Sequence, residues 1–175
     1  APVLEDFAKA VEEGDTDAVN RFLDAGVDVD AVCQPLGWWT AVHLAAREGH
    51  LQLLELLASR GASLDTWRRN SSCSNALQPI HEAVQSSHPH ATQFLLQRGV
   101  DPNVATPMER RTPLFYAVCT ENIEITLMLL RFGASSEVRD HGEGWTPLIY
   151  AASHNNVKLM RLLECGGGVN ETFVV

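Results

Sequence analysis

The sequence has no apolar run that approaches the roughly 18 residues of a membrane-spanning helix, although 45% of its 175 residues are apolar. It opens with no positively charged and apolar leader, so we expect no secretory signal and no membrane partner. Its four cysteines form no C-x-x-C pair, which argues for reduced thiols rather than a disulfide framework. These absences predict a cytoplasmic protein, with the nucleus as a second compatible location. The cysteines are Cys33, Cys73, Cys119 and Cys165.

Positive charge is also scarce, because the chain carries a net charge of −9. Binding to a nucleic acid duplex requires a basic surface, so we expect no duplex as a partner. The charge is uneven, since the first 30 residues hold nine acidic side chains against only Lys9 and Arg21. Two interpretations of this acidic start stay open: a solvated face that caps the fold, or a docking site for a basic partner.

The sequence lacks the local patterns of common catalytic and metal sites. It contains no glycine-rich phosphate loop and no nucleophile elbow, and nothing in the pattern pairs Cys119 with a base. Among the seven histidines, His88, His90 and His50 form the most suggestive group. A tight zinc site needs four converging ligands, however, and the cysteines lie elsewhere in the chain. We therefore expect no metal, no cofactor and no enzymatic activity.

The sequence does contain a helical hairpin in residues 38–66. Small apolar side chains recur at helical spacing up to Gly49, where a glycine with positive φ can end a helix. We expect Thr40 to accept a free backbone N–H as the N-cap of this first helix. A second apolar series follows at once and stops at Gly61. Its members are Leu51, Leu53, Leu54, Leu56 and Leu57.

The hairpin recurs along the chain with a period near 34 residues. Each unit is expected to end its second helix at a glycine, and the last four units open on a related four-residue core. Proline directly after the N-cap favours a helix start in three of these cores. The glycines are Gly26, Gly61, Gly99, Gly133 and Gly167, and the cores are Thr40–His43, Gln78–His81, Thr112–Phe115 and Thr146–Ile149.

This pattern resembles the ankyrin repeat, a hairpin finger followed by two antiparallel helices, whose core reads T-P-L-H-x-A. The resemblance implies an all-α solenoid of helix–turn–helix repeats, in which each unit buries its apolar face on its neighbours. Leu57 is then expected in the core between repeats. The chain begins at Ala1 and stops after entering a further finger, so we expect a fragment of a longer protein. The predicted single array has repeats at about 4–30, 37–66, 76–104, 110–138 and 144–170.

Several positions depart from the family pattern. Ala41 replaces the core proline in one unit, and Gln78 replaces the N-cap threonine in another. Phe115 stands where histidine is usual. The remaining departures are Ile149 for histidine, and Ser87 and Glu121 for Gly49 at the turn between helices, where a left-handed backbone is expected.

All four tryptophans lie in the predicted fingers, together with several arginines. Both residue types are enriched at interface hot spots. We expect a monomeric array whose fingers and inner helices bind a protein or peptide partner with an acidic or aromatic segment. A structural role, stacking between fingers, is an equal alternative for Trp39 and Trp145. The predicted partner-binding residues are Trp38, Trp39, Trp67, Arg68, Arg69, Arg110, Arg111, Tyr116, Arg139, Trp145 and Tyr150.

Two arginine pairs carry the sharpest form of this prediction. We expect Arg68–Arg69 and Arg110–Arg111 to stand side by side on adjacent fingers, at solvated tips that contribute little to stability. Trp67 is expected beside the first pair. The second finger, residues 66–76, is about four residues longer than its counterparts and rich in turn formers. It is therefore expected to be mobile at its tip and to close over the partner.

The resemblance implies a non-catalytic recognition module. Within the family, Pro79–Ala83 is similar to a P-I-H-E-A stretch of ankyrin substrate adaptors of cullin ubiquitin ligases, which carry a suppressor-of-cytokine-signalling box after their repeats. The alternative is an array that senses a nucleotide or small ligand, with finger Trp on a base and Arg on phosphate. Asn103 resembles the target of asparaginyl hydroxylation in ankyrin proteins. Asn170 matches less well, because Gly168 replaces the preceding acid.

Overall fold

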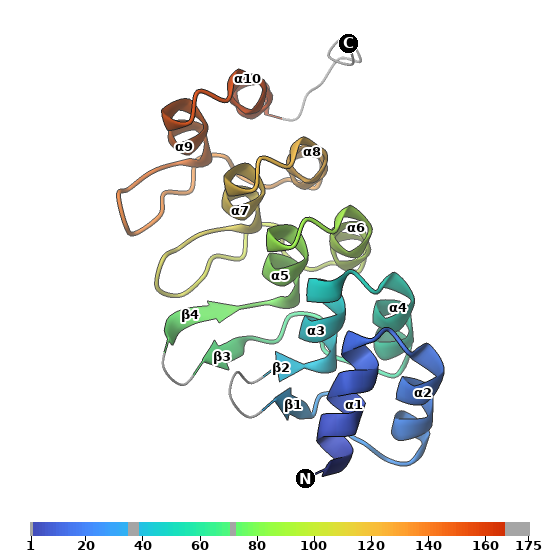
Figure 1. Ribbon diagram of the computed structural model, residues 1–175. Coiled ribbons are helices and arrows are strands. Elements are labelled where there is room, and N and C mark those ends of the chain that lie inside the picture. Colours follow the sequence, from blue (N-terminus) through green and yellow to red (C-terminus); the bar gives the residue numbers. More distant parts are fainter. Residues whose placement is uncertain (1, 35–38, 71–72, 167–175) are drawn as a thin grey trace. The chain divides into compact units, whose positions relative to one another are not determined.

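The computed structural model describes residues 2–34, 39–70 and 73–166. The chain, drawn in Figure 1, forms two compact units, residues 1–100 (unit 1) and 101–175 (unit 2). The predicted fold class is confirmed, because the described residues form ten helices and only four short strands.

Unit 1 contains three helix pairs and two strand hairpins. In the described residues its helices are α1 (Pro2–Glu12), α2 (Thr16–Asp24), α3 (Ala41–Glu48), α4 (Leu51–Ser59), α5 (Pro79–Gln85) and α6 (Pro89–Gln97). Its strands are β1 (Val32–Gln34), β2 (Trp39–Thr40), β3 (Arg68–Asn70) and β4 (Cys73–Leu77), paired antiparallel as β1 with β2 and β3 with β4. The first helices of successive pairs pack on one another, α1 on α3 and α3 on α5, and the second helices do the same.

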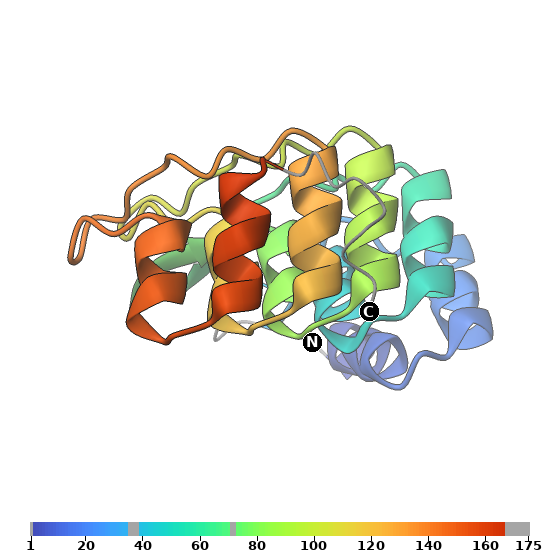
Figure 2. The ribbon, with the colours of Figure 1, turned by 90° about the horizontal axis from the view of Figure 1, so that it is seen from above.

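Unit 2 contains two helix pairs and two long loops. Its helices are α7 (Pro113–Cys119), α8 (Ile123–Arg131), α9 (Pro147–Ser153) and α10 (Val157–Glu164). Figure 2 shows α9 lying beside α7 and α10 beside α8. The loops before α7 and α9 are its fingers, and neither contains an assigned strand within the described residues.

The core of each unit lies between successive helix pairs. Leu57 of α4 is fully buried, and Leu129 of α8, its counterpart in unit 2, is buried as well. The prediction that Leu57 lies in the core is therefore confirmed. Burying one such side chain contributes about 1.5–3 kcal/mol relative to exposure, so the leucine series of the second helices holds each unit together.

The turn inside each helix pair takes the expected left-handed backbone. Gly49 has φ of 73°, and Ser87 and Glu121 have φ of 61° and 54°, which confirms the prediction for these two non-glycine residues. At Gly49 a second constraint applies, because an added Cβ would lie only 2.4 Å from Nδ1 of His88. Glycine is thus required there for space as well as for φ.

The last helix ends where the sequence predicts. α10 has eight residues against nine in α8, and Gly166 has a positive φ of 58°. Gly167 itself lies outside the described residues. The expectation that the second helix of this pair ends near Cys165 is confirmed, since Cys165 is its C-cap.

The N-caps differ between the units. In unit 2 the hydroxyls of Thr112 and Thr146 each accept the backbone N–H three residues later, at 3.3 Å. The corresponding prediction for Thr40 in unit 1 is wrong, because Thr40 Oγ1 makes no cap bond and lies 2.9 Å from Nδ1 of His43 instead. The hydroxyl of Thr40 donates to the imidazole at the third helical position and makes no bond to the backbone of that turn.

Candidate recognition surface

In unit 1 the finger base is tied to helix α3 by one buried histidine. Nε2 of His43 lies 3.1 Å from the carbonyl oxygen of Thr66 and 3.3 Å from that of Leu77. Because carbonyls only accept, Nε2 carries the proton and donates to both, while Nδ1 accepts from the Thr40 hydroxyl. Burial lowers the pKa of His43 to about 4, the Leu77 bond opposes this, and Arg68 adds to it. His43 is therefore neutral near pH 7.

Arg68 belongs to the interior of this surface rather than to a solvated tip. Its Nε and Nη2 lie 2.8 and 2.7 Å from one carboxylate oxygen of Glu82, and the two side chains are only 14% and 5% exposed. Burial raises the pKa of Glu82, and the positive charge of Arg68 opposes that rise. The expectation that Arg68 stands at a solvated loop tip is therefore wrong, because its side chain is paired with a buried acid; its effect on stability stays a prediction.

Trp39 is covered on its ring by arginines of the same unit. The guanidinium of Arg68 lies 4.1 Å from the ring centroid and that of Arg47 lies 4.6 Å from it. This arrangement connects strand β2 with α3 and with the neighbouring finger. Trp39 thus makes the contacts that the structural alternative for this residue describes, while any partner contact stays a prediction.

Other predicted residues of unit 1 are exposed or lie outside the description. Trp67 is 37% exposed, and its ring centroid lies 6.1 Å from that of His81. Trp38 and the finger tip at 71–72 lie outside the described residues, as does the side chain of Arg69. The two arginine pairs belong to separate units, so their expected side-by-side placement stays a prediction.

The fingers of unit 2 are closed by side chains. The backbone N–H of Arg111 donates to Thr106 Oγ1 at 3.1 Å, and the N–H of Thr106 donates to the Arg111 carbonyl at 3.0 Å. Thirty-four residues later, Asp140 and Trp145 repeat the arrangement, with the Trp145 N–H donating to Asp140 Oδ1 at 2.8 Å. Buried Thr106 and Asp140 therefore do in unit 2 what strand pairing does in unit 1.

The two fingers of unit 2 are also bound to each other. The N–H of His141 donates to the Glu109 carbonyl at 2.8 Å, and Nδ1 of His141 lies 3.0 Å from the Met108 carbonyl oxygen. Exposed Arg110 has φ of 53°, at the position that Gly144 occupies in the next finger with φ of 70°. A non-glycine residue held there is strained by about 1 kcal/mol. Arg139 donates to the Gly144 carbonyl at 2.8 Å.

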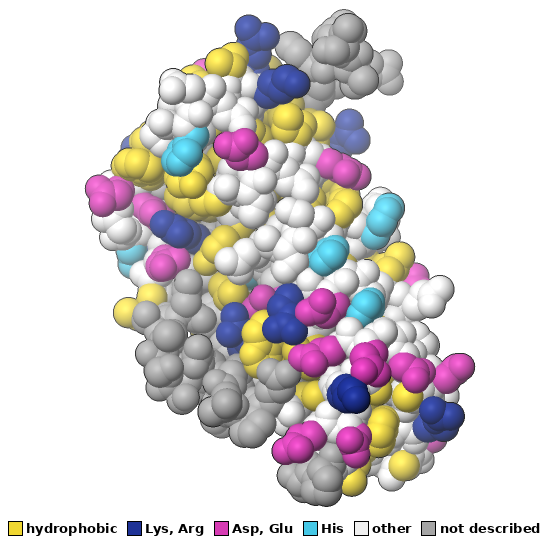
Figure 3. All heavy atoms as spheres, viewed as in Figure 1, with side chains coloured by type: hydrophobic (Ala, Val, Ile, Leu, Met, Phe, Trp, Pro, Cys, Tyr) yellow, Lys and Arg dark blue, Asp and Glu magenta, His cyan; other side chains and the backbone are white. Residues whose placement is uncertain are grey.

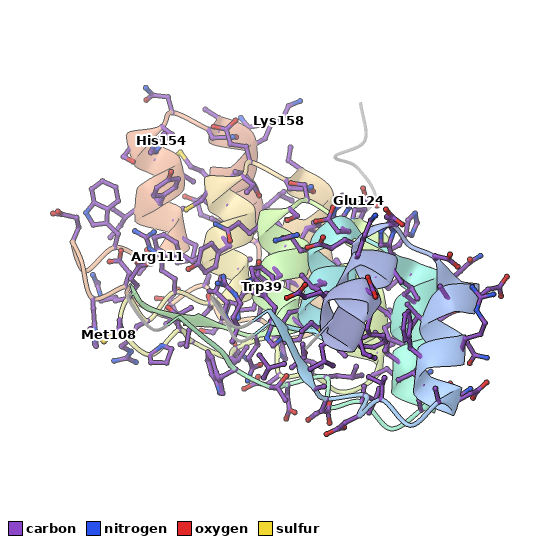
Figure 4. All side chains as sticks on the ribbon, turned by 60° about the horizontal axis from the view of Figure 1, so that its bottom comes forward. Trp39, Met108, Arg111, Glu124, His154 and Lys158 are labelled. Carbon is purple, nitrogen blue, oxygen red and sulfur yellow. The ribbon has the colours of Figure 1, made fainter. Side chains whose placement is uncertain are left out.

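Beyond the finger bases, aromatic rings continue across α7 and α9. The Arg111 guanidinium lies 5.0 Å from the Phe115 ring, and Phe115 lies 5.6 Å from Tyr150. Tyr150 also contacts Trp145 at 6.2 Å and stacks on His154 at 4.3 Å between ring centroids. We call these five residues the Arg111 row; Figure 4 labels Arg111 and His154, its two ends. Tyr116, by contrast, is buried on α7.

The cysteine next to this row is not an activated nucleophile. Burial raises the pKa of Cys119, and a hydrogen bond with Tyr150 only partly opposes it. Burial likewise raises the pKa of Tyr150, and that of Cys33 to about 12. Thiolate chemistry needs a lowered pKa, so neither thiol is prepared for it.

The histidines act as packing and bridging groups. Nε2 of His50 lies 3.0 Å from the Glu12 carbonyl oxygen of the preceding helix pair, and His88 packs on Gly49. Within the described residues no three His, Cys, Asp or Glu side chains come together as metal ligands.

Asn103 ties the loops on the far side of unit 2. Its side-chain amide donates to the Gly133 carbonyl at 3.1 Å, and its Oδ1 accepts the Ser135 N–H at 2.7 Å. Asp30 accepts the Ser63 N–H at 3.0 Å in the same way in unit 1. Asn103 is exposed, and its modification stays a prediction; Asn170 lies outside the described residues.

Acidic side chains gather over α1 and α2 (Figure 3). Some of them pair within unit 1, since Asp24 lies 2.7 Å from Arg60 and Glu12 lies 3.5 Å from Arg47. Exposed pairs of this kind contribute at most about 1 kcal/mol each. Both interpretations of the acidic start, a cap and a docking site, therefore stay open.

Comparison with known proteins identifies the family. The model for ankyrin repeats (three copies) matches residues 7–106 and 80–172. The human "Ankyrin repeat, SAM and basic leucine zipper domain-containing protein 1" is 34% identical over 119 residues, which are 65% of this chain and 23% of that protein. A "Putative ankyrin repeat-containing protein" of Treponema pallidum (strain Nichols) is 35% identical over 100 residues, 57% of this chain and 32% of its own length.

The match therefore spans about a quarter to a third of each of these relatives. In the described part of the chain, no helix is both long and apolar enough to cross a membrane. Ankyrin repeats are interaction modules, and the motif, the helix pairs and the family match all agree here. The chain belongs to the ankyrin-repeat family.

Proposed function

We propose that this chain is a non-catalytic module that recognises a protein or peptide partner through its fingers and inner helices. The observation that carries the proposal is the composition of that surface. Partly exposed aromatic rings lie on it in both units, at Trp39 beside Arg47 in unit 1 and at Trp145 and Tyr150 in unit 2. Residue types of this kind dominate interface energetics, while the nearby thiol of Cys119 is held away from reactivity by a raised pKa.

The test is a selection of 12-residue peptides displayed on phage against the full chain. We expect families of related peptides that bind with micromolar dissociation constants in solution, measured by fluorescence anisotropy. Peptides that bind should protect finger and inner-helix amides from hydrogen exchange. If no peptide binds above background, or if protection falls on the opposite helices α2, α4, α6, α8 and α10, the proposal is wrong.

A narrower form of the proposal is a substrate adaptor of a ubiquitin ligase. Its support is the similarity of Pro79–Ala83 to the P-I-H-E-A stretch of such adaptors. These five residues are buried at the start of α5, where Glu82 pairs with Arg68. The packing of α5 and the Glu82–Arg68 pair therefore explain this stretch without a role in a ubiquitin ligase. Reconstitution of the full-length protein with purified cullin-ligase components tests this form directly; absence of a complex at micromolar concentrations would remove it.

The alternative is recognition of a nucleotide or another small ligand. The stacked rings of Tyr150 and His154 near Arg111 are chemically suited to a base and a phosphate. Tryptophan fluorescence with a panel of nucleotides tests it. Quenching that saturates at submillimolar concentration would favour this function, and an unchanged spectrum at millimolar concentration would exclude it.

We also propose a location and a modification. The first is a cytoplasmic location, with the nucleus also compatible; fluorescence microscopy of the tagged full-length protein tests it. The second is hydroxylation of Asn103, whose amide is bonded to Gly133 and Ser135. Intact-mass analysis after incubation with an asparaginyl hydroxylase should show one added oxygen, and an unchanged mass would contradict it.

A further inference from the structure

The guanidinium of Arg111 makes only long contacts with acidic side chains of its own unit. Its contacts with Glu109 and Asp140 are 3.6 and 3.5 Å long and have no hydrogen-bond geometry. Its Nε is buried without an acceptor among the described residues. A guanidinium has five N–H donors, and a buried donor without an acceptor costs free energy. Arg111 is therefore a strong donor group that the fold leaves incompletely satisfied.

The neighbouring groups of the row add one donor, at Trp145, and one acceptor, at His154. Within the described residues the indole N–H of Trp145 has no acceptor, while the Trp145 backbone N–H uses Asp140 Oδ1. Nδ1 of His154 lies 2.9 Å from the Ser153 hydroxyl and 3.0 Å from the Tyr150 carbonyl oxygen, and its Nε2 has no described partner. A ligand that complements Arg111 and the Trp145 indole must supply acceptor oxygens, and a donor group of the ligand can bond Nε2 of His154.

The acids around Arg111 limit how much negative charge the ligand can carry. Asp140 is 4% exposed and already holds the Trp145 N–H, whereas Glu109 is 44% exposed and its contact is the longer of the two. A single carboxylate can replace Glu109 on Arg111 with paired, shorter bonds. A phosphate dianion would be repelled more strongly by Glu109, Asp140 and the nearby Glu121, whose charge also reaches Tyr150.

The rings supply area next to this acceptor site. Trp145 and Tyr150 are half-buried and His154 is exposed, so each presents a part of its ring to solvent. At the finger tip Met108 is 57% exposed. Rings fixed by mutual stacking lose little conformational entropy on binding. An apolar or aromatic side chain of a partner would find preformed surface here.

We propose that the Arg111 row is the docking site for an extended acidic peptide segment. One carboxylate of the segment binds Arg111, and an aromatic or aliphatic side chain near it in sequence lies against Trp145 and Tyr150. This inference rests on the proposed function and specifies its site and partner chemistry. It also assigns recognition to unit 2, because Arg68, the finger arginine of unit 1 that lies on an aromatic ring, already holds Glu82 at 2.7–2.8 Å.

The test is a double-mutant cycle between the full chain and the best displayed peptide. We expect the selected peptides to share an Asp or Glu close to an aromatic or aliphatic residue. Arg111→Lys, which keeps the charge but not the paired geometry, should weaken binding at least tenfold, about 1.4 kcal/mol. Replacing the peptide acid by its amide should weaken binding equally, and combining both changes should add little further loss.

Controls separate a binding role from a structural one. Arg161→Gln, on exposed α10, should leave the dissociation constant within twofold, and circular dichroism should show the same unfolding midpoint for Arg111→Lys and the unchanged chain. Trp145→Leu provides a second variant that should also weaken binding about tenfold. Selective shifts of the Trp145 indole resonance in NMR spectra, with that of Trp39 unchanged, would locate the peptide on unit 2.

The outcomes of failure are distinct. If peptides bind but carry no acid, or if the effects of the Arg111 and peptide changes simply add, the inference is wrong while the proposed function stands. Saturable nucleotide binding that depends on Arg111 would replace the peptide with a phosphate ligand and also overturn it. If no peptide binds at all, the proposed function fails first.

Discussion

The two units build the same helix pairs but stabilise their fingers by different chemistry. In unit 1, the buried imidazole of His43 donates to two finger carbonyls, and strands close the fingers. In unit 2, Phe115 takes the histidine position, Thr112 caps the helix, and Asp140 closes a finger. The hydrogen bonds of His43 in unit 1 are thus replaced in unit 2 by the packing of Phe115 and by bonds from side chains to the backbone. The helix pair tolerates both because it depends mainly on apolar burial.

The same comparison separates two arginines that look alike in the sequence. Arg68 pairs at 2.7–2.8 Å with buried Glu82 and lies on Trp39. Arg111 lies on Phe115 but meets its acids only at 3.5–3.6 Å and leaves a buried Nε without an acceptor. Arg68 is thus fully paired inside unit 1, whereas the terminal nitrogens of Arg111, whose side chain is 33% exposed, have only these longer contacts. The predictions below test this division.

The largest effect should come from removing core leucines at matched positions. Leu57→Ala in unit 1 and Leu129→Ala in unit 2 should each lower the free energy of unfolding by roughly 2–5 kcal/mol, because both side chains are fully buried. Hydrogen exchange should accelerate mainly in the unit that carries the change, since each unit has its own core. A loss below about 0.5 kcal/mol in denaturant titration would show that the leucine is not in the core.

The arginines should differ sharply when each is truncated. Arg68→Ala should cost about 3 kcal/mol because it leaves Glu82 buried without its partner, while Arg111→Ala should cost about 1 kcal/mol or less. Removing Arg68 should raise the pKa of Glu82 further. The loss should therefore shrink at low pH, where Glu82 is protonated, and grow as pH rises. Equal losses in the free energy of unfolding for the two variants at pH 7 would contradict the proposed difference between Arg68 and Arg111.

Acid should weaken the histidine tie of unit 1. The pKa of His43 is about 4 in the folded state against an ordinary 6.5, so its stabilising contribution is complete above pH 6.5 and lost as pH falls toward 4. Between pH 7 and pH 5 the free energy of unfolding should fall by roughly 2 kcal/mol from this group.

The control for this pH effect is His43→Phe, which copies the residue of unit 2. Its absolute stability should be lower, because two carbonyls lose their donor, but the slope between pH 5 and 7 should be smaller by the His43 contribution. Raised pKa values act in the opposite sense, so Glu82 cannot produce this slope. An unchanged slope in chemical denaturation at several pH values would contradict the assignment.

The smallest effect concerns backbone strain in the unit 2 fingers. Arg110→Gly should stabilise the chain by about 1 kcal/mol, because glycine adopts the left-handed φ of 53° without strain. Gly144→Ala should destabilise by a similar amount, since a Cβ there meets no atom within 4 Å and only the backbone is affected. Thermal unfolding of both variants measures this, and shifts of the same sign would refute the equivalence of the two positions.

The sequence allowed the repeat architecture to be predicted because its signals are local and recur. Apolar spacing, helix-ending glycines and the prolines of α7 and α9 each act within a few residues. The left-handed turns at Ser87 and Glu121 followed from register alone. The error at Thr40 is equally local in origin, because its hydroxyl had two acceptable partners three residues away, a backbone N–H and His43.

It was harder to predict which candidate binding residues are exposed, because the sequence does not show what each side chain contacts. Arg68 and Arg111 both lie in predicted fingers, and only the structure places Glu82 against the first. A signal was present, since Glu82 lies at an otherwise apolar part of α5, where an acid must find a cation. The aromatic row was partly visible in Trp145 and Tyr150, but His154 was missed as a member because it lies at the exposed end of α9.

By itself, the sequence determined that this chain folds as ankyrin helix pairs, because helix spacing and turn residues act over a few positions. Only the tertiary structure decided that Arg68 is closely paired with a buried acid and that Arg111 has only longer contacts with its acids. That difference depends on burial and on distances between residues such as Arg68 and Glu82, 14 positions apart. Desolvation and pairing energies change steeply over an ångström, and no local pattern in the chain records them.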